Sequence, residues 1–224
     1  MIPRFVPVAA LVAELAGCGR SDTPKPSDGS RPAVQPAPLI LVVGTSLTAG
    51  LGLDPSEAYP AVLQAKIDSA GFRYQVVNRG VSGETSAGAL QRVDWLFRQR
   101  VAVLILETGA NDGLRGLDPD SLRSNIEAIV RRARRQDPPP AILLLGMEAL
   151  PNMGSDYGAR FRSAYRDAAR QLGVPLVPFL LEGVGGYDSL NQEDGIHPTA
   201  AGQRRVADLI WPALLPLLQR PEPR

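Results

Sequence analysis

Residues 39–46 have the sequence Leu-Ile-Leu-Val-Val-Gly-Thr-Ser, and this stretch decides the fold class. Its first five residues are apolar and partly β-branched, which predicts a strand buried on both faces, as in the parallel sheets of α/β proteins. Gly44, Thr45 and Ser46 follow at the carboxyl end of that strand, where α/β folds form their sites. Taken alone, a serine in this position is usually a turn residue or a helix N-cap.

Strand-like and helix-like segments alternate along the chain. The strand-like segments are residues 39–43, 74–77, 101–106, 141–146 and 174–177. The helix-like segments are residues 59–69, 86–98, 117–136, 157–172 and 199–218. Alternating β and α elements predict an α/β fold with a parallel sheet between helical layers.

Two more loops with glycine follow strand-like segments. One contains Gly83 in Val-Ser-Gly-Glu-Thr, and the other contains Asn111 in Thr-Gly-Ala-Asn-Asp-Gly. Each loop can offer backbone N–H groups or a side-chain amide to a developing negative charge. Ser-Gly and Asn-Asp-Gly are also ordinary turn sequences, so neither loop is decisive alone.

His197 is the only histidine of the chain, and it lies in Asp-Gly-Ile-His-Pro, residues 194–198. If imidazole is the base in this protein, His197 must supply it. Asp194 stands three residues earlier, so one turn of chain can bring its carboxylate to one ring nitrogen and leave the other free for a nucleophile. Pro198 also suits the first position of a helix, and the segment can equally open the last helix.

Together, these four segments resemble the SGNH hydrolases, also called the GDSL-type esterases and lipases. Ser46, Gly83, Asn111 and His197 match the serine, glycine, asparagine and histidine of the four family blocks, and the resemblance extends over residues 38–218. Within the family, the chain most resembles the bacterial arylesterases and the multifunctional acyl-CoA thioesterase/lysophospholipase branch. The resemblance implies a three-layer α/β/α sandwich, flavodoxin-like, with five parallel strands in the order 2-1-3-4-5.

The resemblance also implies a role for each matching residue. Ser46 would be the nucleophile, His197 the base and Asp194 the residue that orients the ring. The backbone N–H groups of Ser46 and Gly83 and the side-chain amide of Asn111 would form the oxyanion hole. The expected activity is hydrolysis of short- to medium-chain acyl or aryl esters, with thioesters and lysophospholipids as further candidates.

Two alternatives to this activity stay open: a carbohydrate O-deacetylase with the same chemistry, and a catalytically silent, surface-tethered binding protein. Apolar side chains that follow two of the strands suit an acyl or aryl group, although they can also merely close the core over the sheet edge. These candidate pocket residues are Leu114, Leu117, Leu150 and Met153.

Thr45 departs from the family pattern, which has aspartate at this position. That carboxylate is expected to hold the nucleophile loop by hydrogen bonds. A threonine hydroxyl can accept such a bond, but as a weaker, uncharged acceptor. We therefore expect the substitution Thr45→Asp to raise turnover.

Composition and charge set limits on the other function classes. A net charge of +1 gives no electrostatic reason to expect a nucleic-acid partner. One cysteine excludes an internal disulfide, and one histidine without a cysteine cluster argues against a zinc enzyme, so we expect no metal and no cofactor. Residues 39–219 are long enough for one well-buried domain, which we expect to act as a monomer on a small-molecule or lipid ester.

The N-terminus resembles a bacterial lipoprotein signal peptide, residues 1–17, followed by Cys18 as the lipidated residue of a Leu-Ala-Gly-Cys motif. Residues 18–38 are rich in Pro and Ser and would form a flexible tether, and residues 220–224 a short tail. These features predict an enzyme anchored by lipid in the bacterial cell envelope, at the outer membrane and facing the periplasm, where acyl-CoA is not expected as the natural substrate. In a cytosolic protein, Cys18 would instead be a stray thiol.

Overall fold

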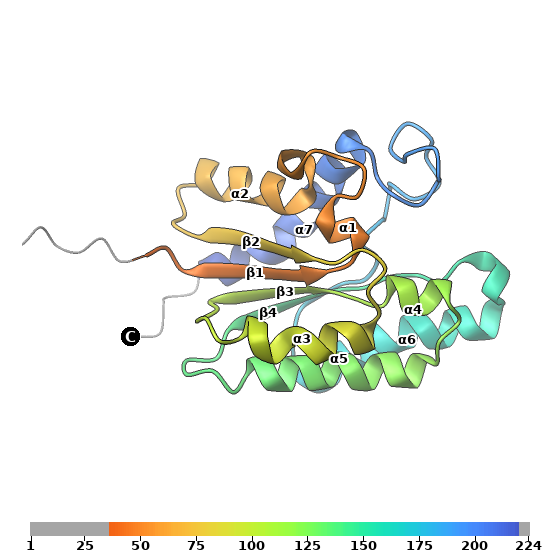
Figure 1. Ribbon diagram of the computed structural model, residues 1–224, viewed down its shortest axis with the longest axis horizontal. Helices are drawn as coiled ribbons and strands as arrows, with labels where there is room; N and C mark the ends of the chain where they lie inside the picture. Colours follow the sequence, from red (N-terminus) through yellow and green to blue (C-terminus); the bar gives the residue numbers. More distant parts are fainter. Residues whose placement is uncertain (1–35, 220–224) are drawn as a thin grey trace, which may run out of the picture. The chain divides into compact units, whose positions relative to one another are not determined.

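The computed structural model describes residues 36–219, and their centre is a sheet of five parallel strands (Figure 1). The strand order is β2-β1-β3-β4-β5, which confirms the predicted order. The strands are β1 (Leu39–Gly44), β2 (Gln75–Gly80), β3 (Val103–Glu107), β4 (Ala141–Leu145) and β5 (Leu176–Val177).

Helices cover both faces of the sheet and complete the predicted α/β/α sandwich. Helices α2 and α7 pack on one face, and α3, α5 and α6 pack on the other (Figure 1). The helices are α1 (Ser46–Ala49), α2 (Tyr59–Ser69), α3 (Ser86–Leu96), α4 (Ala110–Leu114), α5 (Pro119–Ala133), α6 (Ser155–Leu172) and α7 (Ala200–Leu218), with 3₁₀ helices η1 (Pro55–Glu57) and η2 (Pro151–Met153).

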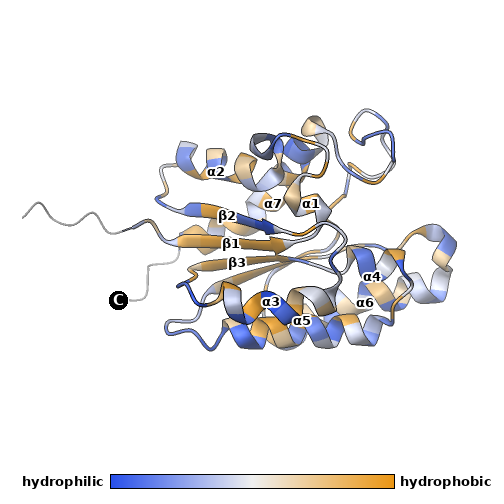
Figure 2. Cartoon of the chain, viewed as in Figure 1, coloured by the Kyte–Doolittle hydropathy of each residue, from blue (hydrophilic) through white to orange (hydrophobic). Residues whose placement is uncertain are grey.

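Burial follows the hydropathy of the segments. The central strands β1 and β3 are almost wholly buried and are the most hydrophobic part of Figure 2. Helix α5 buries one stripe, Leu122, Ile126 and Ile129, against the sheet and leaves arginines on its outer side. The apolar run of residues 39–43 therefore marks the middle of the core, as its composition predicts.

The sequence overestimates the length of some elements. The last strand is only two residues long, because it lies between Pro175 and Pro178, and proline has no N–H for a ladder hydrogen bond. The helix expected at 117–136 begins later, at Pro119, because Asp118 caps it by accepting a hydrogen bond from the backbone N–H of Ser121. The short helices α1 and α4 were not predicted.

The parallel register brings the carboxyl ends of the strands to one edge. Gly44 of β1 pairs with Gly80 of β2, Val43 pairs with Leu106 of β3, and Glu107 pairs with Leu145 of β4. The loops that follow these strands therefore meet at that edge.

Several predicted segments lie outside the described residues: the signal peptide, Cys18, most of the tether and the C-terminal tail. Within residues 36–219, no helix combines the length and apolar character needed to cross a membrane.

Candidate active site

Ser46 lies where β1 turns into the short helix α1. Thr45 is the extended residue that caps α1, and Ser46 is its first helical residue. Strand β2 packs closely against this turn: a Cβ atom on Gly80 would come within 2.7 Å of the carbonyl oxygen of Thr45 and even closer to the backbone of Ala49. Because only glycine permits this approach, the neighbouring strand fixes the path of the turn.

His197 connects Ser46 with Asp194. Its Nε2 lies 2.9 Å from Oγ of Ser46, which is 151 residues away along the chain. Its Nδ1 lies 2.6 Å from Oδ2 of Asp194, and Oδ1 of Asp194 accepts the backbone N–H groups of Ile196 and His197, each at 2.9 Å. The structure therefore brings together all three residues predicted to form the triad.

The carboxylate of Asp194 is held in its charged form. Its pKa is lowered from 3.8 to about 2, first by the hydrogen bond from the backbone N–H of His197, then by the His197 ring and the N–H of Ile196. An ionised Asp194 favours the proton on Nδ1 of His197, which leaves Nε2 as an acceptor towards Ser46.

The loop that carries His197 is tied to itself and to the nucleophile turn. The backbone N–H of Gln192 donates to the carbonyl of His197 at 2.7 Å, and the side-chain amide of Gln192 donates to the carbonyl of Leu51 at 2.7 Å. Pro198 pairs with Asn191 in an antiparallel bridge, and α7 begins only after Thr199. Pro198 is therefore not the first helical residue, as its type suggested, but lies directly before the N-cap of α7, so His197 does stand close to the start of the last helix.

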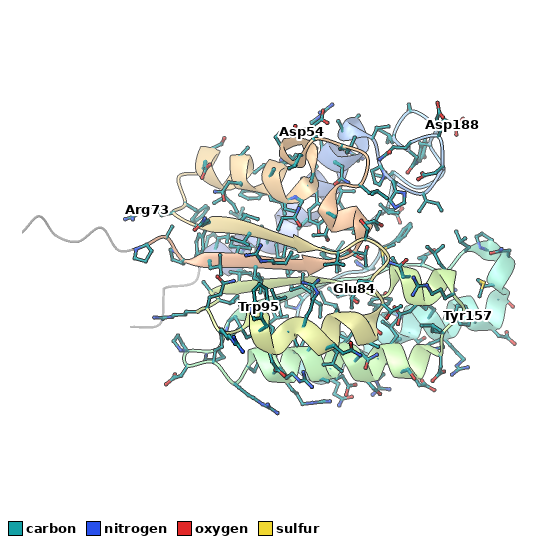
Figure 3. The ribbon with its side chains drawn as sticks, viewed as in Figure 1. Asp54, Arg73, Glu84, Trp95, Tyr157 and Asp188 are labelled. Carbon is teal, nitrogen blue, oxygen red and sulfur yellow. The ribbon has the colours of Figure 1, made fainter. Side chains whose placement is uncertain are left out.

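Asn111 and Gly83 approach each other at the same edge. The amide Nδ2 of Asn111 donates to the carbonyl oxygen of Glu84 at 3.0 Å, and Arg115 donates to the carbonyl of Gly83 at 3.0 Å. Glu84 lies where the ribbons of α3 and α4 meet (Figure 3). Gly83 has φ of +78°, a conformation that favours glycine.

Two further contacts join the loops. The backbone N–H of Val81 donates to the carbonyl of Gly44 at 2.8 Å, which attaches the Gly83 loop to the end of β1. The buried carboxylate of Asp112 accepts the backbone N–H and the hydroxyl of Ser86, at 2.8 and 2.6 Å. All four predicted segments are thus linked at one edge of the sheet.

The sequence analysis missed Glu107, a fully buried carboxylate beside the nucleophile turn. It accepts the backbone N–H of Thr45 at 2.6 Å and the hydroxyl groups of Thr45 and Thr48 at 2.9 and 3.0 Å. Burial raises its pKa, although these hydrogen bonds act in the opposite direction. One signal could have indicated it: Glu107 is the one charged residue of β3, at the end that faces the site.

Thr45 therefore bonds differently from what the sequence suggested. Its hydroxyl does accept a hydrogen bond, from the backbone N–H of Leu47, but at 3.4 Å this contact is weak. The shorter contacts of the hydroxyl are donations to Glu107.

The candidate pocket residues lie in α4, in η2 and in the segments beside them, which follow β3 and β4 at the same edge, and they are partly open to solvent. Leu114, Leu117 and Leu150 expose 44%, 41% and 45% of their surface, so they do not merely close the core. The methyl group of Met153 lies over Gly116, which brings η2 against the loop after α4. Within residues 36–219, no three His, Cys, Asp or Glu side chains gather as metal ligands.

Proteins of known activity resemble this chain over most of its length. Esterase TesA of Pseudomonas aeruginosa is 44% identical over 81% of this chain and 90% of its own. Thioesterase 1/protease 1/lysophospholipase L1 of Escherichia coli K12 is 34% identical over 81% of this chain and 86% of its own. An arylesterase of Vibrio mimicus is 31% identical over 80% of this chain and 88% of its own.

The solved structures agree with these relatives. A crystal structure of TesA superposes with a TM-score of 0.77 at 43% identity, covering 80% of this chain and 99% of that one. Esterase EstA of Pseudoalteromonas sp., inhibited by monoethylphosphonate, gives a TM-score of 0.75 at 30% identity, covering 81% of this chain and 99% of that one. The family model described as GDSL-like lipase/acylhydrolase matches residues 42–205. The chain is therefore a hydrolase that belongs to the GDSL-like lipase/acylhydrolase family.

Proposed function

We propose that this chain is a serine esterase that cleaves short- to medium-chain acyl or aryl esters through an acyl-enzyme on Ser46. The observation that carries the proposal is the position of the His197 ring, 2.9 Å from the hydroxyl of Ser46 on one side and 2.6 Å from Asp194 on the other. A serine hydroxyl is a weak nucleophile, and an adjacent base oriented by a third group activates it.

In the first half of the reaction, Oγ of Ser46 attacks the carbonyl carbon of the ester while Nε2 of His197 takes the hydroxyl proton. The carbonyl π electrons move to oxygen and form a tetrahedral oxyanion. When this intermediate collapses, the bond to the leaving alcohol breaks, and His197 returns the proton to the alcohol oxygen. The acyl group remains on Ser46.

In the second half, water replaces the alcohol. His197 takes a proton from water as its oxygen attacks the acyl carbon, and a second oxyanion forms. Collapse breaks the bond to Oγ of Ser46, which receives the proton from His197, and the carboxylic acid leaves. Asp194 stays ionised in both halves and stabilises the imidazolium.

The oxyanion would be bound by the backbone N–H groups of Ser46 and Gly83 and by the amide of Asn111. In the structure this amide donates one hydrogen to the carbonyl of Glu84, which orients the amide and leaves its second hydrogen for the oxyanion. Losing one such donor typically costs about 10²–10³ in turnover.

The proposed substrate class rests on exposed apolar side chains in the segments that follow the strands at this edge and in the His197 loop. Large apolar residues of the surrounding loops are exposed, which suits an acyl or aryl group better than a sugar. These residues are Leu51, Val81, Leu114, Leu117, Leu150 and Ile196. The names of the relatives, esterase, arylesterase and thioesterase/lysophospholipase, support ester and thioester substrates. A panel of p-nitrophenyl esters, thioesters, lysophospholipids and acetylated sugars separates these classes, and preference for the sugars would favour the O-deacetylase.

Covalent labelling tests the nucleophile. A fluorophosphonate should label the wild type, and Ser46→Ala should lose the label. Ser69→Ala is the matched control, because Ser69 is an exposed serine at the end of α2 and should not affect labelling. An unlabelled wild type would favour the silent binding protein.

We also propose that Cys18 carries a lipid that anchors the enzyme in the bacterial cell envelope. The support is the Leu-Ala-Gly-Cys motif and the Pro- and Ser-rich segment that follows it. Metabolic labelling with a fatty acid should mark the wild type and not Cys18→Ser; a label that persists in Cys18→Ser would contradict the anchor.

A further inference from the structure

Glu107 is an ionisable group at a fully buried position of the sheet, where a charge is unfavourable. It ends the central strand β3, has no exposed surface, and has a pKa that burial raises. None of its contacts described within residues 36–219 involves a lysine, arginine or histidine. A carboxylate buried without a cation is costly, so the fold alone does not explain its presence.

Its hydrogen bonds all go to the nucleophile turn. Strand β3 lies beside β1, and Glu107 reaches the residues on both sides of Ser46: it accepts the N–H and hydroxyl of Thr45 and the hydroxyl of Thr48. The hydroxyl of Tyr59 lies 2.6 Å from the hydroxyl of Thr48 and continues this network.

The absence of a side chain at Gly44 leaves room for the carboxylate of Glu107 beside the turn. Residue 44 must be glycine, because a Cβ atom there would collide with the side chains of Thr48 and Glu107. The end of β1 therefore approaches the carboxylate closely enough for the N–H of Thr45 to lie 2.6 Å from it.

We propose that Glu107 is a positioning residue, whose carboxylate holds the turn on both sides of Ser46 and so aims the Ser46 hydroxyl at Nε2 of His197. The proposal rests on the proposed role of Ser46 as nucleophile. The same hydrogen bonds hold Thr45, and with it the peptide that carries the backbone N–H of Ser46, one of the proposed oxyanion donors. A misplacement of about 1 Å in such a group can cost on the order of 10² in rate.

Glu107→Gln tests the proposal with almost no change of shape. The glutamine oxygen can take the place of Oε2, which accepts the N–H of Thr45 and the hydroxyl groups of Thr45 and Thr48, but it accepts these hydrogen bonds without a charge. The NH₂ group then takes the place of Oε1 and faces the Thr45 hydroxyl, which can no longer donate there. We expect kcat on a p-nitrophenyl ester to fall by roughly 10–100-fold while KM changes by less than about threefold.

Glu127→Gln is the matched control. Glu127 is also a buried glutamate, but it lies on α5 and pairs with Arg123 and Arg131. Its substitution should lower the melting temperature without lowering kcat. If Glu107→Gln likewise lowers only the melting temperature, or if kcat stays within about twofold of wild type, the positioning role is wrong.

Thr45 supplies a second test that does not depend on the folding of Glu107→Gln. Thr45→Val removes the hydroxyl that donates to Glu107 and should lower kcat, whereas Thr45→Ser keeps it and should restore most of the activity. In the double variant, the losses from Glu107→Gln and Thr45→Val should be less than multiplicative, because both break the same contact. Multiplicative losses, or equal activity of the Val and Ser variants, would overturn the proposal.

Fluorophosphonate labelling separates this inference from the proposed function. If the wild type is not labelled at Ser46, the serine mechanism itself fails. If the wild type is labelled at Ser46 and Glu107→Gln is labelled at the same rate, only the positioning role fails.

Discussion

Asp194 shows how one carboxylate can set the state of the proposed base. Its Oδ2 contacts Nδ1 of His197, and its pKa of about 2 keeps it charged at neutral pH. Asp194→Asn would place either an oxygen without charge or an NH₂ group against Nδ1. The NH₂ group favours the tautomer with the proton on Nε2, which cannot accept the Ser46 proton.

We therefore predict that Asp194→Asn lowers kcat by about 10²–10⁴ with little change in KM. Steady-state kinetics on an aryl ester measures this directly. Asp188→Asn is the control, because Asp188 is exposed on the outer part of the same loop (Figure 3) and should leave kcat unchanged. A wild-type kcat in Asp194→Asn would remove Asp194 from the mechanism.

The hydrogen bond between Thr45 and Glu107 indicates what an aspartate at position 45, the family residue, would do. An aspartate at this position would put a second carboxyl against buried Glu107, and two such groups cannot both be ionised, so they would share a proton. A shared proton makes a stronger hydrogen bond than the neutral hydroxyl does. We predict that Thr45→Asp raises kcat at neutral pH and that the gain disappears in alkaline solution, where the proton is lost.

Thr45→Asn is the control for that gain, because asparagine has nearly the size of aspartate but no acidic proton that it could share with Glu107. Turnover that is flat or lower in Thr45→Asp at neutral pH, or an equal rise in Thr45→Asn, would show that the threonine is not a weaker substitute for the family aspartate.

At the scale of elements, α3 follows the loop that contains Gly83 and α4 contains Asn111, two of the proposed oxyanion donors. The carboxylate of Asp112 in α4 accepts both the N–H and the hydroxyl of Ser86, the first residue of α3. This contact fixes Gly83, three residues before Ser86, relative to Asn111, which precedes Asp112.

We predict that Asp112→Ala lowers both stability and turnover. It leaves the two buried donors of Ser86 without an acceptor, which typically costs about 1–3 kcal/mol in the free energy of unfolding. It also lets the proposed donors Gly83 and Asn111 move apart, so kcat should fall more than KM rises. Asp120→Ala on α5 removes only an exposed ion pair with Arg160 and should change neither quantity noticeably. Normal kcat in a destabilised Asp112→Ala would restrict this contact to folding.

The elements that the sequence predicts well are those with a strong periodic or apolar signal. The apolar run at 39–43 predicts the central strand, and the amphipathic stripe of α5 predicts a helix that packs on the sheet. The strand order was predicted from the family resemblance. The short helices α1 and α4 have too few residues for a period, and the prolines beside β5 shorten it.

The site could be predicted only where family blocks mark it. Ser46, His197 and Asp194 are in contact as expected, because parallel strands bring their loops to one edge. Glu107 was missed, since nothing in a single strand sequence tells which neighbour its last side chain will meet. Its role depends on the register of β1 beside β3, which is a property of the assembled sheet.

At the scale of the whole molecule, the charged form of Glu107 destabilises the fold, although the same carboxylate is proposed to position the nucleophile. Its pKa is raised above the ordinary value of 4.5, chiefly by burial, so the folded protein binds its proton more tightly than the unfolded chain does. Stability from this group is therefore fully present below pH 4.5 and is lost as the pH rises through the folded pKa. Its titratable neighbours Tyr59 and Tyr165 have pKa values raised well above 10.0 by burial, so they stay neutral over this range.

We predict that the melting temperature of the wild type, relative to that of Glu107→Gln, falls as the pH rises from 4.5 towards neutrality. The glutamine has no proton to lose, so taking the difference cancels groups that titrate alike in both proteins, including Asp194. Thermal unfolding of the two proteins in parallel over this range measures the difference. A difference that does not vary with pH would mean that Glu107 has the same pKa in the folded protein and in the unfolded chain, so that burial does not disfavour its charged form.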